Sequence, residues 1–317
     1  MRVEGTEMQV RRYVPASVPS VFWPRRLSST IARTARPRTT PTAHPMYMWS
    51  QLAHQPVFML SASFLGIVLV CAALAPLLAP YDPSYIDLAS SQQPPSWAHP
   101  MGTDRLGRDI LSRILHGSRV TIGVATTAAL LAGTLGTVTG AVAGYFGGRV
   151  DSLLMRGTDL MLALPTFFIL VAAQAILGPS LPGVILIIAL TGWMSAARIV
   201  RGQFMSLTRR EFVEAARAVG CGPWRIVFRH ILPNASSQVV VLFTLSIADA
   251  VLVESALSFL GLGMPSYQPS WGNMLTDGQV GILSGGWWIA FFPGLMILLT
   301  ALSINLIGDY LQDALRH

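Results

Sequence analysis

The sequence predicts an all-α polytopic membrane protein with six transmembrane helices and a cytoplasmic loop between helices 4 and 5. Hydrophobic residues make up 52% of the 317 residues and charged residues only 12%, whereas a soluble domain carries about 25% charged residues. The mean hydropathy is +0.53. Several apolar runs are about 20 residues long, which is the length that spans a bilayer as a helix. Helices are expected because a segment in lipid must satisfy its own backbone hydrogen bonds.

The arginines predict the orientation in the cytoplasmic membrane. All 22 basic residues are arginines, eight of them in residues 1–45, and the loops 178–183 and 261–286 contain none. Cytoplasmic loops carry an excess of arginine, so both termini and the stretch 198–229 are expected inside. The polar segment 81–118 is an exception, and we expect its arginines to pair with Asp104 and Asp109. This distribution favours contact with membrane lipid over a nucleic-acid partner.

Three regions follow one another along the chain. Residues 1–45 have low hydrophobicity and high charge, which predicts a disordered basic tail; a translation start at Met46 or Met48 is the open alternative. Residues 46–117 contain the first span, at 56–79, and an extracytoplasmic segment. Residues 118–317 contain the remaining spans, predicted at 120–144, 161–177, 184–200, 239–260 and 287–307.

Three glycines in the second span are spaced by four residues. Gly136, Gly140 and Gly144 therefore lie on one helical face, and Gly148 continues the spacing just past the span. A glycine groove allows another helix to approach closely. The alternative interpretation is a flexible hinge.

The loop between spans four and five contains signals for two short helices. Thr208 followed by Glu211 is a capping-box pattern that predicts a helix start. Gly220 predicts a left-handed end to the first helix. Pro223 suits the first turn of a second helix, and Pro233 is expected to end that helix.

The first of these helices is predicted to be amphipathic. Its apolar residues recur at helical spacing, and Glu214 can pair with Arg210 or Arg217 on the polar face. Small alanines bury little membrane area, so we expect this helix to dock on a protein. A helix lying in the lipid headgroups is the alternative. The predicted apolar face consists of Phe212, Ala215, Ala216 and Val219.

The loop resembles a known signature. Glu214-Ala215-Ala216, Gly220 six residues after that glutamate, and Leu232-Pro233 resemble the EAA motif of bacterial ABC importer permeases of type I architecture. The chain departs from the pattern in having His230, followed by Ile231, where the family has an isoleucine two residues before the leucine. Stretches 99–120, 253–275 and 291–315 resemble the C-type permease of dipeptide, oligopeptide and nickel importers. The resemblance covers about residues 50–315 and makes 118–317 the type I permease domain.

The resemblance implies a transport function shared with other chains. It implies a permease subunit, in a heterodimer with a second permease chain, that translocates di- or oligopeptides; nickel or another small solute is the alternative. Its partners would be cytoplasmic ABC ATPase subunits, which bind ATP and Mg, and an extracytoplasmic solute-binding protein. The ATPase-coupling residues would be Glu214, Ala215, Ala216, Gly220, Leu232 and Pro233.

The residue types present limit the chemistry of this chain. It has no lysine, which excludes the GxxxxGK[ST] phosphate loop, and its histidines and two cysteines have no metal-ligand or disulfide spacing. We therefore expect no catalytic, cofactor or metal site. Asp249 and Glu254 lie within the fifth span, about 140° apart on a helix. They either line a translocation path or make polar contacts between helices, and a path for ions would favour an ion-coupled secondary transporter.

Overall fold

The computed structural model of the chain describes residues 55–265 and 267–316. The chain divides into two units, Met1–His44 and Pro45–His317. The predicted tail, 1–45, lies outside the described residues, and the fold that follows is that of the second unit. Regular structure in the described part is helical, and its β-structure is one isolated bridge between Thr103 and Asp109. The predicted all-α class is confirmed.

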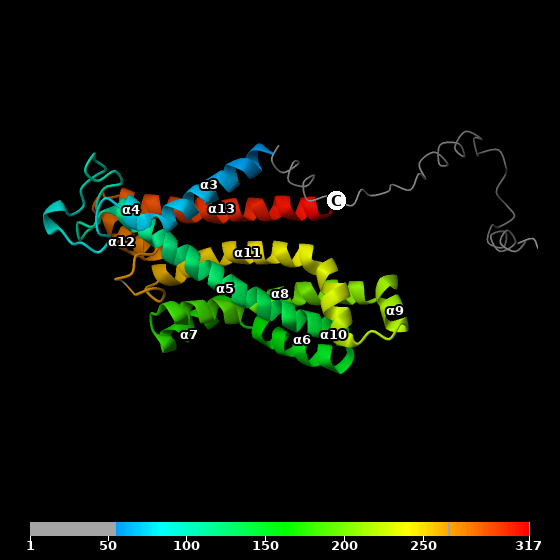
Figure 1. Cartoon of the computed structure of the whole chain (residues 1–317). Coiled ribbons are helices and arrows are strands. Elements are labelled where there is room, and N and C mark those ends of the chain that lie inside the picture. Colours follow the sequence, from blue (N-terminus) through cyan, green and yellow to red (C-terminus); the bar gives the residue numbers. More distant parts are fainter. Residues whose placement is uncertain (1–54, 266, 317) are drawn as a thin grey trace, which may run out of the picture. The chain divides into compact units, whose positions relative to one another are not determined.

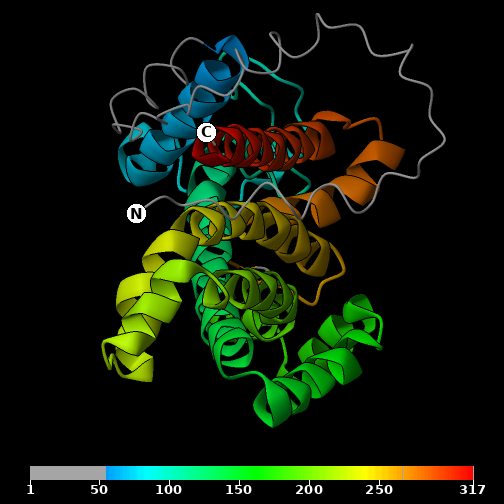
Figure 2. The same ribbon diagram turned by 90° about the vertical axis from the view of Figure 1, so that its right-hand side faces the viewer.

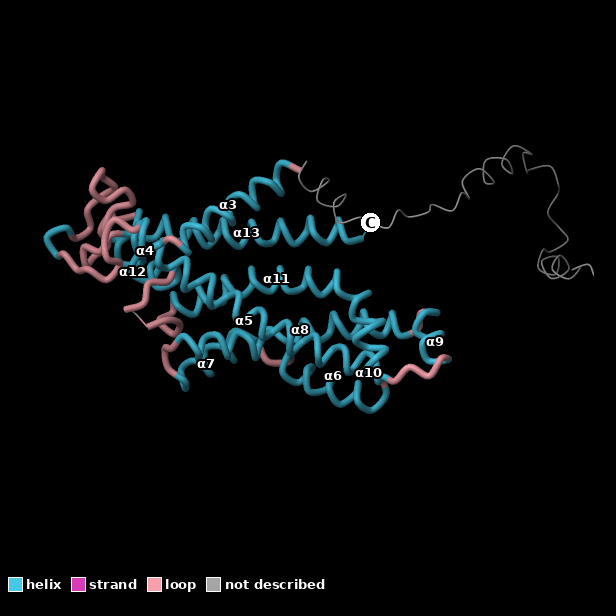
Figure 3. Tube along the Cα trace, in the orientation of Figure 1, coloured by secondary structure: helices cyan, strands magenta, loops and turns pink. Residues whose placement is uncertain are grey.

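The helices follow the chain in the order given in Figure 1, and Figure 3 shows the loops that join them. The first half contains α3 (Pro56–Ala73), α4 (Ala75–Leu78), the short turn η2 (Leu88–Ser90), α5 (Ile110–Phe146), α6 (Gly148–Leu162) and α7 (Thr166–Leu177). The second half contains α8 (Leu181–Thr208), α9 (Glu211–Ala218), α10 (Pro223–Ile226), the π-helical turn η3 (Val227–Ile231), α11 (Leu232–Phe259), α12 (Trp271–Leu283) and α13 (Trp288–Arg316).

Among the described residues, five helices are long and apolar enough to cross a membrane, and there are six spans if the bent pair α6–α7 is one of them. The predicted third span, 161–177, has the wrong bounds. Its first two residues are the end of α6 and residues 166–177 are α7, and these two helices meet at 80°. Pro165 is the last residue of the break and the N-cap of α7; a proline disfavours helical backbone in the residue before it. The 12 residues of α7 measure only about 18 Å, less than a bilayer core.

α5 and α8 are among the spans that extend beyond their predicted apolar runs. α5 begins at Ile110, so the end of the predicted polar segment 81–118 is helical. Asp109 starts this helix, because its carboxylate accepts the backbone N–H of Ser112 at 2.8 Å, a typical N-cap interaction. α8 continues past the predicted end at 200 to Thr208. Hydropathy marks the part of a helix that lies in lipid, whereas capping determines where the helix ends.

The helices pack around a core made largely of small and β-branched residues. α5 packs most extensively against α8, and α11 lies between α8 and α13 (Figure 2). The main core cluster joins these helices through side chains that include Val124, Ala128, Ile187 and Val251. Close packing of small side chains is the usual means of association between membrane helices.

The loops separate into two groups at opposite ends of the bundle. α9 and α10 lie at the same end as the end of α13, whereas α12, the segment 79–109 and the α7–α8 turn lie at the other (Figure 1). The arginine-rich loop is therefore on the opposite side from the two polar segments.

Candidate functional site

The loop between α8 and α11 begins with α9, a helix of eight residues. Arg210 is its N-cap residue, with an extended backbone and no side-chain cap hydrogen bond. The predicted capping box at Thr208 is wrong. Thr208 is the last residue of α8, and its hydroxyl donates to the Phe204 carbonyl at 2.7 Å. An N-cap residue needs a non-helical backbone, which Thr208 does not have.

α9 ends in a glycine turn of the Schellman type. Gly220 has φ +78°, in the left-handed region that the sequence predicted for it. Its N–H donates to the Arg217 carbonyl at 2.9 Å, and the Cys221 N–H donates to the Ala216 carbonyl at 3.0 Å. These are the two bonds that define the Schellman motif. The direction in which the chain leaves α9 therefore depends on a left-handed residue at this position.

The buried face of α9 differs from the predicted one. Val213 and Ala216 are buried in a cluster with Phe204 of α8 and Ile226 and Ile231 of the second half of the loop. Because α9 lies against α8 and η3, this line of side chains is covered. The predicted apolar face is thus divided, and only Ala216 turns inward. The other three members, Phe212, Ala215 and Val219, are exposed, as is Glu214.

The polar face of α9 also differs from the expectation. The ion pairs of the described residues do not join Glu214 to Arg210 or Arg217. Arg217 lies instead over the ring of Tyr145, at the end of α5, with its guanidinium carbon 5.7 Å from the ring centroid. The carboxylate of Glu214 is thus left on the exposed side of the loop.

The second half of the loop runs without a break into α11. Pro223 is at the start of α10, as predicted, but Pro233 does not end a helix. It lies in the first turn of α11, directly after the π-helical turn η3, and the whole stretch Pro223–Phe259 behaves as one long helix. A π turn is wider than an α turn, which accommodates the proline ring. The side chain of Asn234 donates to the His230 carbonyl at 2.6 Å. Leu232 packs against the buried cluster and Pro233 is exposed.

Two groups of residues at this end of the bundle were not anticipated. Trp224 and Phe228 stack with centroids 6.0 Å apart, and Trp224 also meets Phe146 edge-on. Their spacing of four residues was the available signal. Arg198 pairs with Asp159 at 2.5 Å, and Arg201 pairs with Asp151, joining α8 to α6. No sequence pattern connects residues 39 and 50 positions apart.

The three glycines of α5 lie against α8. A Cβ at Gly136 would meet Ala196 and the Trp193 carbonyl, and one at Gly144 would lie 2.7 Å from the Arg201 carbonyl. Gly140 has the same arrangement, because an added Cβ would meet the Ala197 carbonyl. The backbones of α5 and α8 therefore approach too closely for any side chain. Gly148 is not part of this groove: it begins α6, and space around it is open.

Asp249 and Glu254 of α11 have different surroundings, in agreement with their angular separation. Asp249 is exposed and lines a cavity of about 290 Å³ between α5, α7, α8 and α11. Glu254 is fully buried, and its carboxylate accepts the hydroxyl of Ser258 at 2.8 Å and that of Ser255 at 3.4 Å. The hydroxyls of Thr121 on α5 and Ser270 before α12 also lie beside it.

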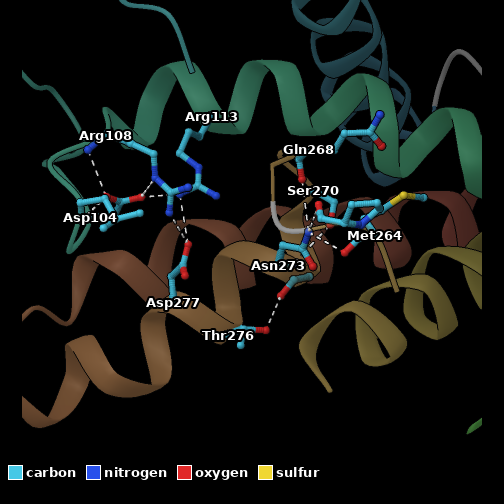
Figure 4. A network of polar contacts seen from close by, with 12 residues as sticks. Asp104, Arg108, Arg113, Met264, Gln268, Ser270, Asn273, Thr276 and Asp277 are labelled. Carbon is cyan, nitrogen blue, oxygen red and sulfur yellow. Dashed lines mark hydrogen bonds and ion pairs between the residues drawn. The ribbon is translucent and has the colours of Figure 1, made fainter. Parts of the chain in front are cut away.

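A charge network joins the two polar segments at the opposite end of the bundle (Figure 4). Arg108 contacts Asp104 at 2.6 Å and Asp277 of α12 at 2.8 Å. Arg113 pairs with the same two carboxylates and is only 2% exposed. The expected pairing with Asp104 is confirmed, but Asp277 was not foreseen. Asp109 instead contacts His99 at 2.9 Å.

Asn273 holds the loop before α12. Its side-chain amide lies 3.2 Å from each of the carbonyls of Met264, Pro265 and Gln268 (Figure 4). Within the described residues no group of three or more His, Cys, Asp or Glu side chains is arranged to hold a metal ion. Cys71 and Cys221 are free thiols.

Two family models match the chain. Residues 136–317 match the binding-protein-dependent transport system inner membrane component. Residues 46–95 match the N-terminal transmembrane domain of oligopeptide transport permease C. Together they cover most of the part that the structure describes.

Curated relatives match over nearly their whole length. The dipeptide transport system permease protein DppC of Bacillus subtilis is 39% identical over 84% of this chain and 83% of its own. The di/tripeptide transport system permease protein DppC of Pseudomonas aeruginosa is 36% identical over 97% of both chains. The glutathione transport system permease protein GsiD of Pectobacterium atrosepticum is 37% identical over 84% of this chain and 89% of its own.

One solved structure has a similar fold. A chain of the inward-facing MetNI methionine ABC transporter aligns with a TM-score of 0.52 and 18% identity, over 64% of this chain and 95% of that chain. At this identity the likeness concerns the fold alone.

Proposed function

Because the chain belongs to the family of binding-protein-dependent transport system inner membrane components, we propose that it is the C-type permease subunit of an ATP-driven importer of di- or oligopeptides. The family makes the chain a transport subunit of an ABC system in the inner membrane. The peptide substrate is inferred from relatives whose names specify dipeptides, tripeptides and glutathione. ATP and Mg would be bound by separate ATPase subunits, because this chain has no lysine for a phosphate loop.

The observation that carries the proposal is the construction of the α9 loop. α9 is anchored on its inner side by Val213 and Ala216, whereas Phe212, Glu214 and Val219 project from it. The loop is also continuous with a membrane helix, because α10, η3 and α11 follow one another without a break. Because α9 packs against this continuous stretch through Val213 and Ala216, a partner that moves α9 would move α11 as well. We propose that the exposed side of α9 docks on a cytoplasmic ATPase, and that nucleotide-driven motion passes through it as a rigid-body change of the helices.

The remaining coupling residues fit the same role. Gly220 sets the direction between α9 and α10, Leu232 packs into the cluster beneath α9, and Pro233 adjoins the π turn. The small side chain of Ala215 projects little from the exposed side of α9, which suits close docking in a groove of the partner.

We infer an orientation with both termini in the cytoplasm. Seven arginines lie between 198 and 229, around the α9 loop, and loops 178–183 and 261–286 have none. Arginine is enriched on the cytoplasmic side. A second permease chain would complete the translocation path, and a solute-binding protein would deliver the substrate to the α12 end of the bundle.

The experiment is uptake by cells that lack the gene and carry either the wild-type gene or an empty vector. Radiolabelled dialanine, trialanine and Ni²⁺ are supplied in parallel. We expect the wild-type gene to restore uptake of at least one peptide and to leave Ni²⁺ uptake unchanged. Restoration of Ni²⁺ uptake alone would replace the peptide by the metal as substrate. Uptake that persists without the ATPase subunits but collapses with the ion gradient would make the chain a secondary transporter.

A further inference from the structure

The carboxylate of Asp249 is an isolated charge inside a membrane-spanning helix. It lies 10 residues before the end of α11, which is about 15 Å along a helix. In the described part of the chain it takes part in no ion pair and accepts no hydrogen bond. An intramembrane carboxylate is costly unless it faces water, a cation or a hydrogen-bond donor. Asp249 therefore needs a partner from outside the described residues.

The cavity beside Asp249 has room for that partner. Its walls are mostly small side chains, among them Ala132, Gly192 and Ser195, and its volume is about 290 Å³. This volume approaches the lower end of the range for ligand pockets. Arginine and histidine are absent from the residues that line it. The cavity is therefore large enough for part of a small solute and carries a single negative charge.

Four hydroxyl groups line the cavity, those of Thr166, Thr191, Ser195 and Ser246, and among the described residues none of them donates to Asp249. Two of the four are taken up by backbone carbonyls. Thr191 donates its hydroxyl to the Ile187 carbonyl at 2.9 Å, and Ser246 donates to the Leu242 carbonyl at 2.8 Å. Both are thus occupied by their own helices. A group that enters the cavity with a positive charge and N–H donors would satisfy Asp249 better than water alone, because hydrogen bonds to charged groups are the stronger ones.

We propose that Asp249 forms a cation subsite of the translocation path, at which the protonated amino group of a peptide is held during passage. The peptide identity of the ligand rests on the proposed function, whereas the cavity and its charge do not. Every peptide with a free amino terminus carries this group at neutral pH. Asp249 faces a cavity and not a closely packed surface, which favours a passing ligand over a permanent ion pair with an arginine or lysine of the second permease chain.

The test uses a cysteine reporter in the assembled complex. Cys71 and Cys221 are replaced by serine, and Ser246, which lines the same cavity one turn before Asp249, is replaced by cysteine. The complex is placed in nanodiscs with its partner chains. The rates of modification by a trimethylammonium and by a sulfonate methanethiosulfonate reagent are measured. The ratio of the two rates reports the charge of the cavity.

In the wild type we expect the cationic reagent to react faster than the anionic one. In Asp249→Asn the ratio of the cationic to the anionic rate should fall at least about tenfold, because one unit charge is removed at short range in a medium of intermediate dielectric. Dialanine should slow the reaction in the wild type, whereas N-acetyl-dialanine should not, and Asp249→Asn should abolish the difference. Asp309→Asn is the matched control, because Asp309 is an exposed carboxylate on α13 outside this cavity. It should leave both the ratio and the protection unchanged.

Other outcomes would overturn the proposal in identifiable ways. If Asp249→Asn leaves the ratio unchanged and the second permease chain no longer co-purifies, Asp249 pairs with that chain. If the ratio and the protection are both unchanged in an intact complex, Asp249 has no role in the path. If the wild type shows the cation preference but neither protection by dialanine nor peptide uptake, the peptide function fails while the cation subsite remains. Equal protection by dialanine and its acetylated form would refute amino-group recognition.

Discussion

Replacing Gly220 by valine should abolish the stimulation of ATP hydrolysis by the binding protein and peptide without disrupting the membrane domain. Gly220 has φ +78°, and an added Cβ would have no atom within 4 Å. The substitution therefore creates backbone strain and no clash. Strain of this kind costs about 1–3 kcal/mol, which is about 5- to 160-fold in the population of the native turn. Relief of the strain would break the two Schellman hydrogen bonds and redirect the chain after α9.

This free energy of strain is large for the short loop but small compared with the packing that holds the membrane helices together. α8 and α11 are held by the main core through Ile187, Val251 and Leu257, far from the turn. We expect Gly220→Val to reach the membrane and assemble in normal amounts. The assay is ATP hydrolysis by the purified complex with and without the binding protein and peptide. The stimulated part of the activity should be lost.

Two matched variants separate strain from bulk. Gly220→Asn should keep most of the stimulation, because asparagine tolerates the left-handed region. Gly202→Val should be neutral, since Gly202 lies inside α8 with open space around it and no positive φ. Full stimulation in Gly220→Val would refute the coupling role of the turn. Equal loss in Gly220→Asn would show that the backbone conformation is not the reason.

Three further predictions address packing, polar contacts and orientation. Gly140→Val should lower the melting temperature of the complex, because overpacking at the α5–α8 contact costs about 1–3 kcal/mol. The control Gly123→Val, at an open position of α5, should leave the melting temperature unchanged. Equal melting temperatures in both variants would contradict the close approach of the two helices. Glu254→Leu should reduce the yield of folded complex. Glu254→Gln should retain most of the yield, because the glutamine side-chain oxygen still accepts hydrogen bonds from the buried hydroxyls. Equal yields in the two variants would exclude a role for these contacts. Single cysteines at Arg210 and Tyr267, both exposed, should react with membrane-impermeant reagents from the inside and the outside respectively. Labelling of both from outside would contradict this topology.

Features that depend on neighbouring residues were predictable. Apolar length predicted where the spans lie, because the thickness of the hydrocarbon core requires about 20 residues of helix. Gly220 could be predicted as a left-handed cap because only its own backbone decides that conformation. The glycine spacing in α5 indicated a close helix contact, although not which helix would make it.

Features that depend on residues far apart were not predictable. The spacing in α9 predicts an apolar face of Phe212, Ala215, Ala216 and Val219. Of these only Ala216 is buried, together with Val213, because α8 and η3 cover that side. Pro233 was expected to end a helix, yet the π turn before it lets the helix continue. Asp277 lies 164 residues from Arg113 and completes its ion pairs.

The sequence by itself determined the class, the family resemblance and the position of the loop between α8 and α11, since each depends on local composition or on a short motif. Only the tertiary structure decided which carboxylate of α11 is surrounded by hydrogen-bond donors and which faces a cavity. Asp249 and Glu254 are both acidic residues of one apolar helix, and the two serines that follow Glu254, at positions 255 and 258, supply only part of its surroundings. Glu254 meets hydroxyls of its own helix and lies beside those of Thr121 and Ser270, whereas Asp249 faces a cavity. The difference arises from the packing of the surrounding helices, because a buried charge is stabilised or left open by whatever groups the fold brings beside it.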